Sequence, residues 1–195
     1  MSQILFIDGQ NFINKLEEAL KENKIKIIKW KGFNFRGLFD AVLKGIKIER
    51  KIFYFSKLSE HPDTRDKSKE LIETWRLLKT HLESKEQNFE IIIAGRVRGQ
   101  YEGKGLKKIL VFREKGVDVK IAVDMTSFAC DKKLKTAILA SSDSDLQPAI
   151  KELRNRKTEI VYLGFENSPN KGLTFTTNKT ILIRNSEVLS YYSVK

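Results

Sequence analysis

Short apolar runs alternate with longer segments of helical periodicity along this chain of 195 residues. The apolar runs lie at residues 4–7, 51–55, 89–94, 136–140 and 160–164. Most of them are followed by a stretch in which apolar residues recur every three or four positions, as in a helix with one buried face. Strands that alternate with helices are typical of a mostly parallel sheet covered on both faces. We therefore predict an α/β fold.

Helices are predicted at residues 12–21, 35–45, 63–84, 117–130 and 146–155. An extra strand, a short apolar run and a last helical turn are expected at residues 106–112, 180–183 and 186–191. Asn34 precedes the second helix and is expected to cap it. In the long third helix, Leu71, Trp75, Leu78 and Leu82 recur at helical spacing, which predicts a stripe facing the core.

The length and composition indicate one soluble domain over residues 1–195, with the segment from about 165 to 195 completing the fold. The single cysteine, Cys130, excludes an internal disulfide, fits a reducing compartment and is expected to be buried and inert. We see neither a signal peptide nor an apolar run of membrane-spanning length. The expectation is a cytoplasmic protein with no membrane partner, and a homodimer is left open.

Four aspartates are expected to meet at one edge of the sheet. Asp8 follows the first apolar run, Asp143 and Asp145 follow the run at 136–140, and Asp118 opens the next-to-last long helix. In an open α/β sheet, ligands bind outside the carboxyl ends of the strands. Carboxylates gathered there repel one another unless a cation lies among them, so the pattern favours a hard divalent metal such as Mg²⁺ or Mn²⁺.

Each acid also has a purely structural interpretation. Asp145 and Asp118 have an alternative explanation as helix caps or first-turn acids, and Asp8 beside a glycine as part of a turn. Asn11 is expected to orient an acid or a phosphate near Asp8, with a helix cap as its alternative. Asp124 lies six residues after Asp118, which is a turn of about 240° around the helix, so we expect it only in a supporting position.

The formal charge of +12 favours a partner rich in phosphate, although a basic protein without such a partner remains the alternative. Basic residues with an interleaved tyrosine precede Asp118, and we predict that they bind RNA: Arg96, Arg98, Tyr101, Lys104, Lys107, Lys108, Arg113 and Lys115. The lysines and arginines would contact phosphates, and Tyr101 would stack on an unpaired base. The alternative is a solvated hairpin in which Phe112 packs inward.

Several segments resemble the NYN domain family of PIN-like ribonucleases, and in particular its bacterial LabA-like branch. They are FIDGQN (6–11), KGVDVKIAVDM (115–125), AILASSDSDLQPAIKEL (137–153) and, as the closing segment, KGLTFTTNKTILI (171–183). The chain departs from the family pattern at Ser142, where glycine is common, and at Leu146, where an aromatic residue is frequent. The resemblance implies a Rossmann-like, three-layer α/β/α, PIN-like domain with a mostly parallel central sheet.

The same resemblance implies metal-dependent cleavage of RNA. It maps the acidic site of the family onto Asp8, Asp118 and Asp143, with Asp145 and Asp124 as further acids and Asn11 as a polar partner. We therefore predict a ribonuclease in which Asp8, Asp118, Asp143 and Asp145 are catalytic and the first three bind Mg²⁺ or Mn²⁺.

Other functions remain open. The first rival is a non-catalytic RNA-binding or scaffold module on the same fold. The second is a phosphatase of the haloacid dehalogenase type, which is disfavoured because it needs a second aspartate where this chain has Gln10. Cleavage of DNA is also left open, because neither the charge nor the carboxylates discriminate between the two sugars.

Overall fold

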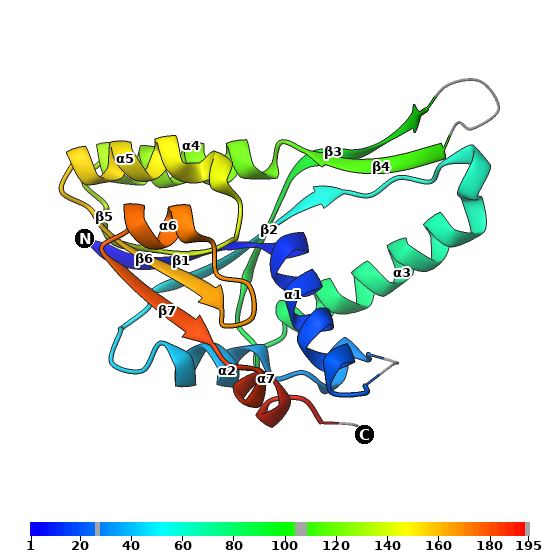
Figure 1. Ribbon diagram of the computed structural model, residues 1–195, viewed down its shortest axis with the longest axis horizontal. Helices are drawn as coiled ribbons and strands as arrows, with labels where there is room; N and C mark the ends of the chain where they lie inside the picture. Colours follow the sequence, from blue (N-terminus) through cyan, green and yellow to red (C-terminus); the bar gives the residue numbers. More distant parts are fainter. Residues whose placement is uncertain (26–27, 104–108, 194–195) are drawn as a thin grey trace.

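The computed structural model describes residues 1–25, 28–103 and 109–193. Seven strands form one sheet in the order β4-β3-β2-β1-β5-β6-β7 (Figure 1). They are β1 (Ser2–Asp8), β2 (Arg50–Lys57), β3 (Glu90–Glu102), β4 (Ile109–Lys115), β5 (Leu134–Ala140), β6 (Glu159–Phe165) and β7 (Lys179–Ile183). All neighbours are parallel except β3 and β4, which form an antiparallel hairpin. The predicted α/β fold with a mostly parallel sheet is confirmed.

Helices cover both faces of this sheet. The α-helices are α1 (Gly9–Glu22), α2 (Phe35–Val42), α3 (Arg65–Leu82), α4 (Val117–Cys130), α5 (Gln147–Asn155), α6 (Lys171–Thr176) and α7 (Asn185–Ser190). Short 3-10 turns are η1 (Trp30–Gly32), η2 (Pro62–Thr64) and η4 (Ser144–Leu146). Figure 1 shows α4, α5 and α6 on one side of the sheet, and α1, α2, α3 and α7 on the other. None of the helices in the described part of the chain combines the length and the apolar character that a membrane crossing needs.

The central strand β1 explains why helices cover both faces of the sheet. Ile4 and Phe6 belong to the core under α4 and α5, whereas Leu5 and Ile7 belong to the core under α1 and α2. Alternate side chains of a strand point to opposite faces, so a continuously apolar strand must be buried on both. The continuous apolar run of β1 therefore encodes its central place in the sheet.

The long helix α3 departs from its predicted packing. Leu78 and Leu82 are buried, and Trp75 packs partly against the core, but Leu71 is 63% exposed. The first half of α3 extends away from the body of the protein along the β3–β4 hairpin, where no further layer covers it (Figure 1). The prediction that Leu71 is a core residue is therefore wrong.

Two more expectations need correction at the ends of elements. Cys130 is exposed, because it is the last residue of α4 and follows the buried position Ala129 by about 100° of helical turn. The hairpin strand runs over Ile109–Lys115 rather than 106–112, and residues 106–108 lie outside the described part of the chain.

The predicted cap of α2 is confirmed, since the Asn34 side chain accepts a hydrogen bond from the Gly37 amide at 2.9 Å.

Candidate functional site

Strands β1 and β5 bring Asp8 next to the serine loop that follows β5. The two strands pair in parallel with Ile7 opposite Ala140, so the residues that follow lie side by side at the carboxyl edge. Asp8 Oδ1 accepts the Asn11 amide at 3.2 Å and thereby caps α1, and Asp8 Oδ2 accepts the Ser141 hydroxyl at 3.2 Å. Asp8 is therefore the cap of α1 rather than a turn residue beside Gly9, and this role is compatible with a place in the site.

Three other acids form a compact group beside Asp8. Asp118, Asp143 and Asp145 each offer a carboxylate oxygen within 4.8 Å of the other two. Asp118 lies in the first turn of α4, while Asp143 caps η4 by accepting the Asp145 amide at 2.9 Å. In the parts of the chain that the structure describes, no lysine or arginine forms an ion pair with any of the three. Their mutual repulsion is thus left without a compensating protein cation.

Asp8 is buried at 9% exposure behind this group. Burial raises the pKa of the Asp8 carboxyl, hydrogen bonds from Asn11 and Ser141 oppose that rise, and the nearby charges of Asp143 and Asp118 add to it. Asp8 is therefore close enough to feel both acids, although the compact group consists of Asp118, Asp143 and Asp145. Of the three predicted metal ligands, Asp118 and Asp143 lie in the group and Asp8 lies beside it. Asp145 is the third member of the group.

Two asparagines hold the loop that carries Asp143. The Asn11 side chain exchanges hydrogen bonds with Ser142, donating to its hydroxyl at 2.9 Å and accepting from its amide at 3.1 Å. The Asn170 side chain donates to the Ser142 carbonyl at 2.8 Å and also caps α6. Asn11 therefore does lie at the site, whereas Asn170 was missed because only the tertiary fold brings it to Ser142.

Asp124 is turned away from the acidic group. Its carboxylate accepts the Tyr54 hydroxyl at 3.0 Å and the Lys120 ammonium at 2.6 Å. The rotation of about 240° from Asp118 accounts for this placement, since the two side chains leave the helix in different directions. Any supporting role of Asp124 in the site is therefore indirect.

Glu114 on β4 is a further acid near the site that the sequence pattern did not reveal. Burial raises the pKa of the Glu114 carboxyl, the Asp8 charge raises it further, hydrogen bonding to Ser56 opposes this, and Asp118 adds a smaller rise. Its Oε1 atom is shielded from solvent and, among the described residues, has no hydrogen-bond partner. The expected strand ended at residue 112, and only the pairing of β4 with β3 places Glu114 near the site.

The β3–β4 hairpin presents two different faces. Arg96 lies opposite Lys115 and Arg98 lies opposite Arg113, so four exposed cations share one face, which we call the basic face. Like charges directly across a sheet are destabilising. The structure describes an ion pair for one of the four, between Arg113 and Glu102 at 2.7 Å.

The remaining predicted RNA-binding residues are not among the four cations of the basic face. Tyr101 lies on the other face of the hairpin, opposite Leu110, and its hydroxyl donates to Asp63. Lys104, Lys107 and Lys108 lie outside the described residues. Phe112 packs against the His61 ring but is 43% exposed, so the alternative in which it packs inward holds only in part.

The two histidines have structural roles. His81 is partly buried, and its Nε2 lies 2.7 Å from the Phe33 carbonyl. His61 caps η2 and stacks edge-on with Phe112. Neither contact involves an acid of the group, which agrees with a site built from carboxylates.

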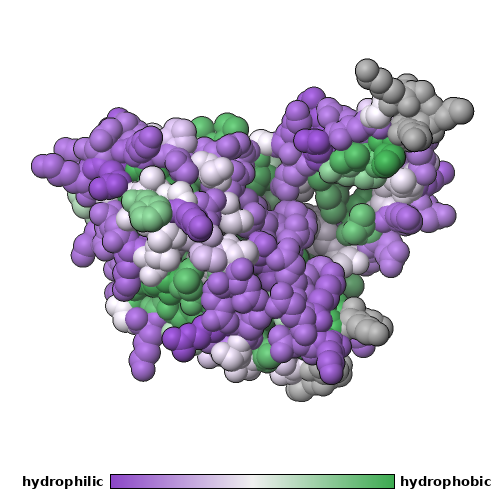
Figure 2. All heavy atoms as spheres, viewed as in Figure 1, coloured by the Kyte–Doolittle hydropathy of each residue, from purple (hydrophilic) through white to green (hydrophobic). Residues whose placement is uncertain are grey.

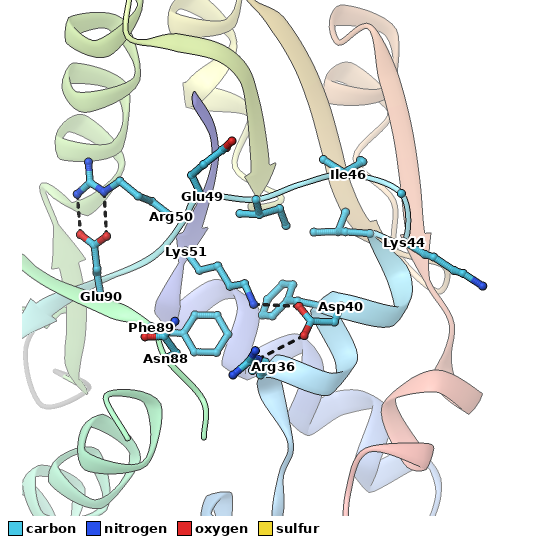
Figure 3. A pocket seen from close by; sticks show the side chains of 14 residues that line it. Arg36, Asp40, Lys44, Ile46, Glu49, Arg50, Lys51, Asn88, Phe89 and Glu90 are labelled. Atoms are coloured by element: carbon cyan, nitrogen blue, oxygen red, sulfur yellow. Dashed lines mark hydrogen bonds and ion pairs between the residues drawn. The ribbon is translucent and has the colours of Figure 1, made fainter. Parts of the chain in front are cut away.

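A larger hollow, of about 570 Å³, lies near the amino ends of β2 and β3 and is lined by charged residues (Figure 3). Three of its four lining cations are paired with protein carboxylates, and Lys44 is the fourth. Lys51 and Arg36 both contact Asp40, at 2.9 Å and 3.4 Å, and Arg50 contacts Glu90 at 2.6 Å. This hollow therefore presents few unsatisfied charges to a ligand.

Comparisons with known proteins agree with this architecture. No curated protein matches the chain significantly. A crystal structure of a protein of unknown function from Vibrio parahaemolyticus RIMD 2210633 superposes with a TM-score of 0.55 at 17% identity, covering 93% of both chains, and supports the fold alone. The sequence profile of the NYN domain family matches residues 3–184, nearly the whole chain. On that match, the chain belongs to the NYN domain family.

Proposed function

We propose that this protein is a metal-dependent ribonuclease that hydrolyses RNA phosphodiester bonds at the acidic group. The observation that carries the proposal is the meeting of Asp118, Asp143 and Asp145 within 4.8 Å, without a protein cation among the described residues. Membership of the NYN domain family, a group of PIN-like nucleases, supports it. We place the protein in the LabA-like branch on the sequence segments alone.

The donor set fits Mg²⁺ or Mn²⁺, because both ions prefer carboxylate oxygens and bind through only a few of them. Asp118, Asp143 and Asp145 would hold the ion, with Asp8 adjacent. When bound, such an ion supplies an activated water and stabilises charge on the leaving oxygen.

The protein residues around the group keep it in place. Asp8 joins the start of α1 to Ser141, and Asn11 and Asn170 bind the two sides of Ser142. Asp143 is thus carried on a hydrogen-bonded loop and Asp118 on the first turn of α4, as precise positioning of a reacting phosphate requires.

The basic face offers a path for the RNA backbone toward this group. Its hairpin runs directly into α4 through Gly116, two residues before Asp118. The four cations would contact phosphates on either side of the scissile bond and offset the repulsion between RNA and the carboxylates. The cross-strand repulsion of the free protein would be relieved in the complex.

Replacement of single acids tests the proposal. We expect Asp118→Asn and Asp143→Asn to lower Mn²⁺-dependent cleavage of a labelled RNA by at least about 100-fold, because the loss of even an outer partner of a metal ligand costs about 10–100-fold. Asp131→Asn, at the exposed end of α4, is the matched control and should cleave normally.

The outcome also separates the main alternatives. RNA binding without cleavage by the wild type, in either Mg²⁺ or Mn²⁺, would replace the ribonuclease with a non-catalytic RNA-binding module. Equal cleavage of DNA and RNA of the same sequence would remove the restriction to RNA. Unchanged cleavage in Asp143→Asn would overturn the site itself.

A further inference from the structure

We propose that the apolar groove between α3 and the β3–β4 hairpin binds an unpaired nucleobase of the nucleic acid whose backbone lies at the acidic group. This inference rests on the proposed function, because it concerns the same substrate. It adds a second recognition element, which would read the base rather than the phosphate.

The groove lies between the hairpin and the first half of α3. One hollow of about 380 Å³ and a neighbouring one of about 240 Å³ share Leu58, Leu71, Val97 and Phe112 as lining residues. Figure 2 shows apolar residues gathered under the hairpin, at the upper right, around a hollow in the surface. The larger hollow is within the roughly 300–1,000 Å³ that is usual for small-ligand pockets.

This groove approaches the acidic site at two of its lining residues. Gln10 and Glu114 line it, and both belong to the surroundings of Asp8. Gln10 follows Asp8 by two residues in the chain, and Glu114 senses the charges of Asp8 and Asp118. A nucleotide next to a phosphate at the acidic group would therefore have the groove within reach of its base.

The lining suits a flat, uncharged ring with polar edges. Phe112 and Leu71 expose 43% and 63% of their surface, and Trp75 contributes a partly buried indole. The Trp75 Nε1–H is shielded from solvent and finds no acceptor among the described residues, which is rare for a buried donor. Bases stack on aromatic rings and carry ring nitrogen and carbonyl acceptors, whereas an aliphatic side chain carries none.

The charges around the hairpin favour a nucleic acid over a peptide as the occupant. The apolar residues Val97 and Phe112 lie on the groove face of the hairpin, and the cations lie on its basic face. Because β4 is an edge strand of the sheet, a chain can pass around it with phosphates on one side and a base on the other. A nucleic acid, which carries phosphates and unpaired bases on the same chain, matches both faces.

Two exposed leucines on α3 provide a matched pair for the test. Leu71 lines both hollows and is 63% exposed, while Leu77 lines neither of the two and is 66% exposed. Leu71→Glu and Leu77→Glu therefore introduce the same charge on the same helix at equal exposure. Trp75→Phe removes the indole donor and keeps an aromatic ring.

Binding is measured in EDTA, so that no cleavage occurs, by the anisotropy of labelled hexamers. One probe is an adenosine hexanucleotide, and the other is a hexamer of abasic ribose phosphates with the same charge. We expect the wild type to bind the first roughly five- to 100-fold more tightly, as one or two stacked bases would give. Leu71→Glu should remove most of this difference, Trp75→Phe part of it, and Leu77→Glu none.

Equal affinity of the wild type for both hexamers would overturn the inference, as would equal effects of the two leucine replacements. If Leu71→Glu instead turned a dimer into a monomer and left base-dependent binding intact, the groove would be a contact between two copies. Base-dependent binding without metal-dependent cleavage would remove the proposed function and keep the groove. Metal-dependent cleavage without base-dependent binding would keep the proposed function and remove the groove as a base-binding site.

Discussion

Charged side chains are paired at the amino end of the parallel strands and unpaired at the carboxyl end, among the described residues. At the amino end, Arg50 binds Glu90 through two hydrogen bonds, at 2.8 Å and 2.6 Å. Asp40 forms ion pairs with both Arg36 and Lys51. At the carboxyl end, the described residues leave a group of three carboxylates without a protein cation. Paired charges at a surface contribute little either way, whereas grouped like charges destabilise the fold until a ligand arrives. The difference supports the carboxyl end as the proposed site, although the larger hollow lies at the amino end.

The largest expected effect is the response of the carboxyl end to metal. Mn²⁺ at 100 times its dissociation constant should stabilise the wild type by about 2.7 kcal/mol, because the ion binds only the folded state. Differential scanning fluorimetry with and without EDTA measures this shift. The shift should vanish in Asp143→Asn and persist in Asp40→Asn, and an equal shift in both variants would abolish the contrast between the two ends.

Removal of cations should matter only on the side of the acidic group. The double replacement of Arg96 and Arg98 by Gln should weaken RNA binding by about tenfold and flatten its salt dependence by about 0.7 per lost phosphate contact. Arg36→Gln at the amino end, where the cation already contacts Asp40, serves as the control. Titrations at several salt concentrations give the slope, and an unchanged slope in the double variant would exclude the basic face as the binding surface.

Neutralisation of one acid at each end should change stability in opposite directions. Without metal, Asp145→Asn removes repulsion and should stabilise the fold by about 0.5–2 kcal/mol. Asp40→Asn removes the partner of Lys51 and Arg36 and should destabilise it by about 0.2–1 kcal/mol. Urea unfolding in EDTA measures both, and destabilisation by Asp145→Asn would show that the acids are not in conflict.

The smallest effect concerns pH. Burial raises the pKa of Asp8 in the folded protein above its value in the unfolded chain, so the folded state holds that proton more tightly. The resulting stabilisation is fully present below the unfolded pKa and is lost as the pH rises through the folded pKa. Asp8→Asn should therefore flatten this part of the stability profile of the metal-free protein. A profile identical to that of the wild type in urea unfolding would contradict the raised pKa.

Much of the fold was readable from local patterns. The fully buried strand β1 and the helix α4 were predicted closely, α4 over its observed bounds, because continuous apolar runs and a helical repeat leave few alternatives. The second half of β3 was not predicted, because its exposed residues Arg96–Glu102 carry charges on a strand that projects from the core. The short helix α6 lacked any repeat long enough to detect.

The site was readable only in part. Asp8, Asp118, Asp143 and Asp145 were expected to converge, with the first three as metal ligands, because strand ends and helix starts share one edge of such a sheet. That rule does not rank the acids by distance, and the structure brings Asp145 rather than Asp8 into the compact group. Glu114 reaches the site from a strand whose register depends on its partner β3, so no local pattern reveals it.

By itself, the sequence determined the class of fold, the edge of the sheet at which the acids gather and the excess of positive charge, because periodicity and strand polarity are local properties. Only the tertiary structure decided which carboxylates touch, that the hairpin divides cations from apolar residues, and that the first half of α3 stays uncovered. Those features depend on pairing between residues far apart in the chain, and such pairing is set by the packing of the whole molecule.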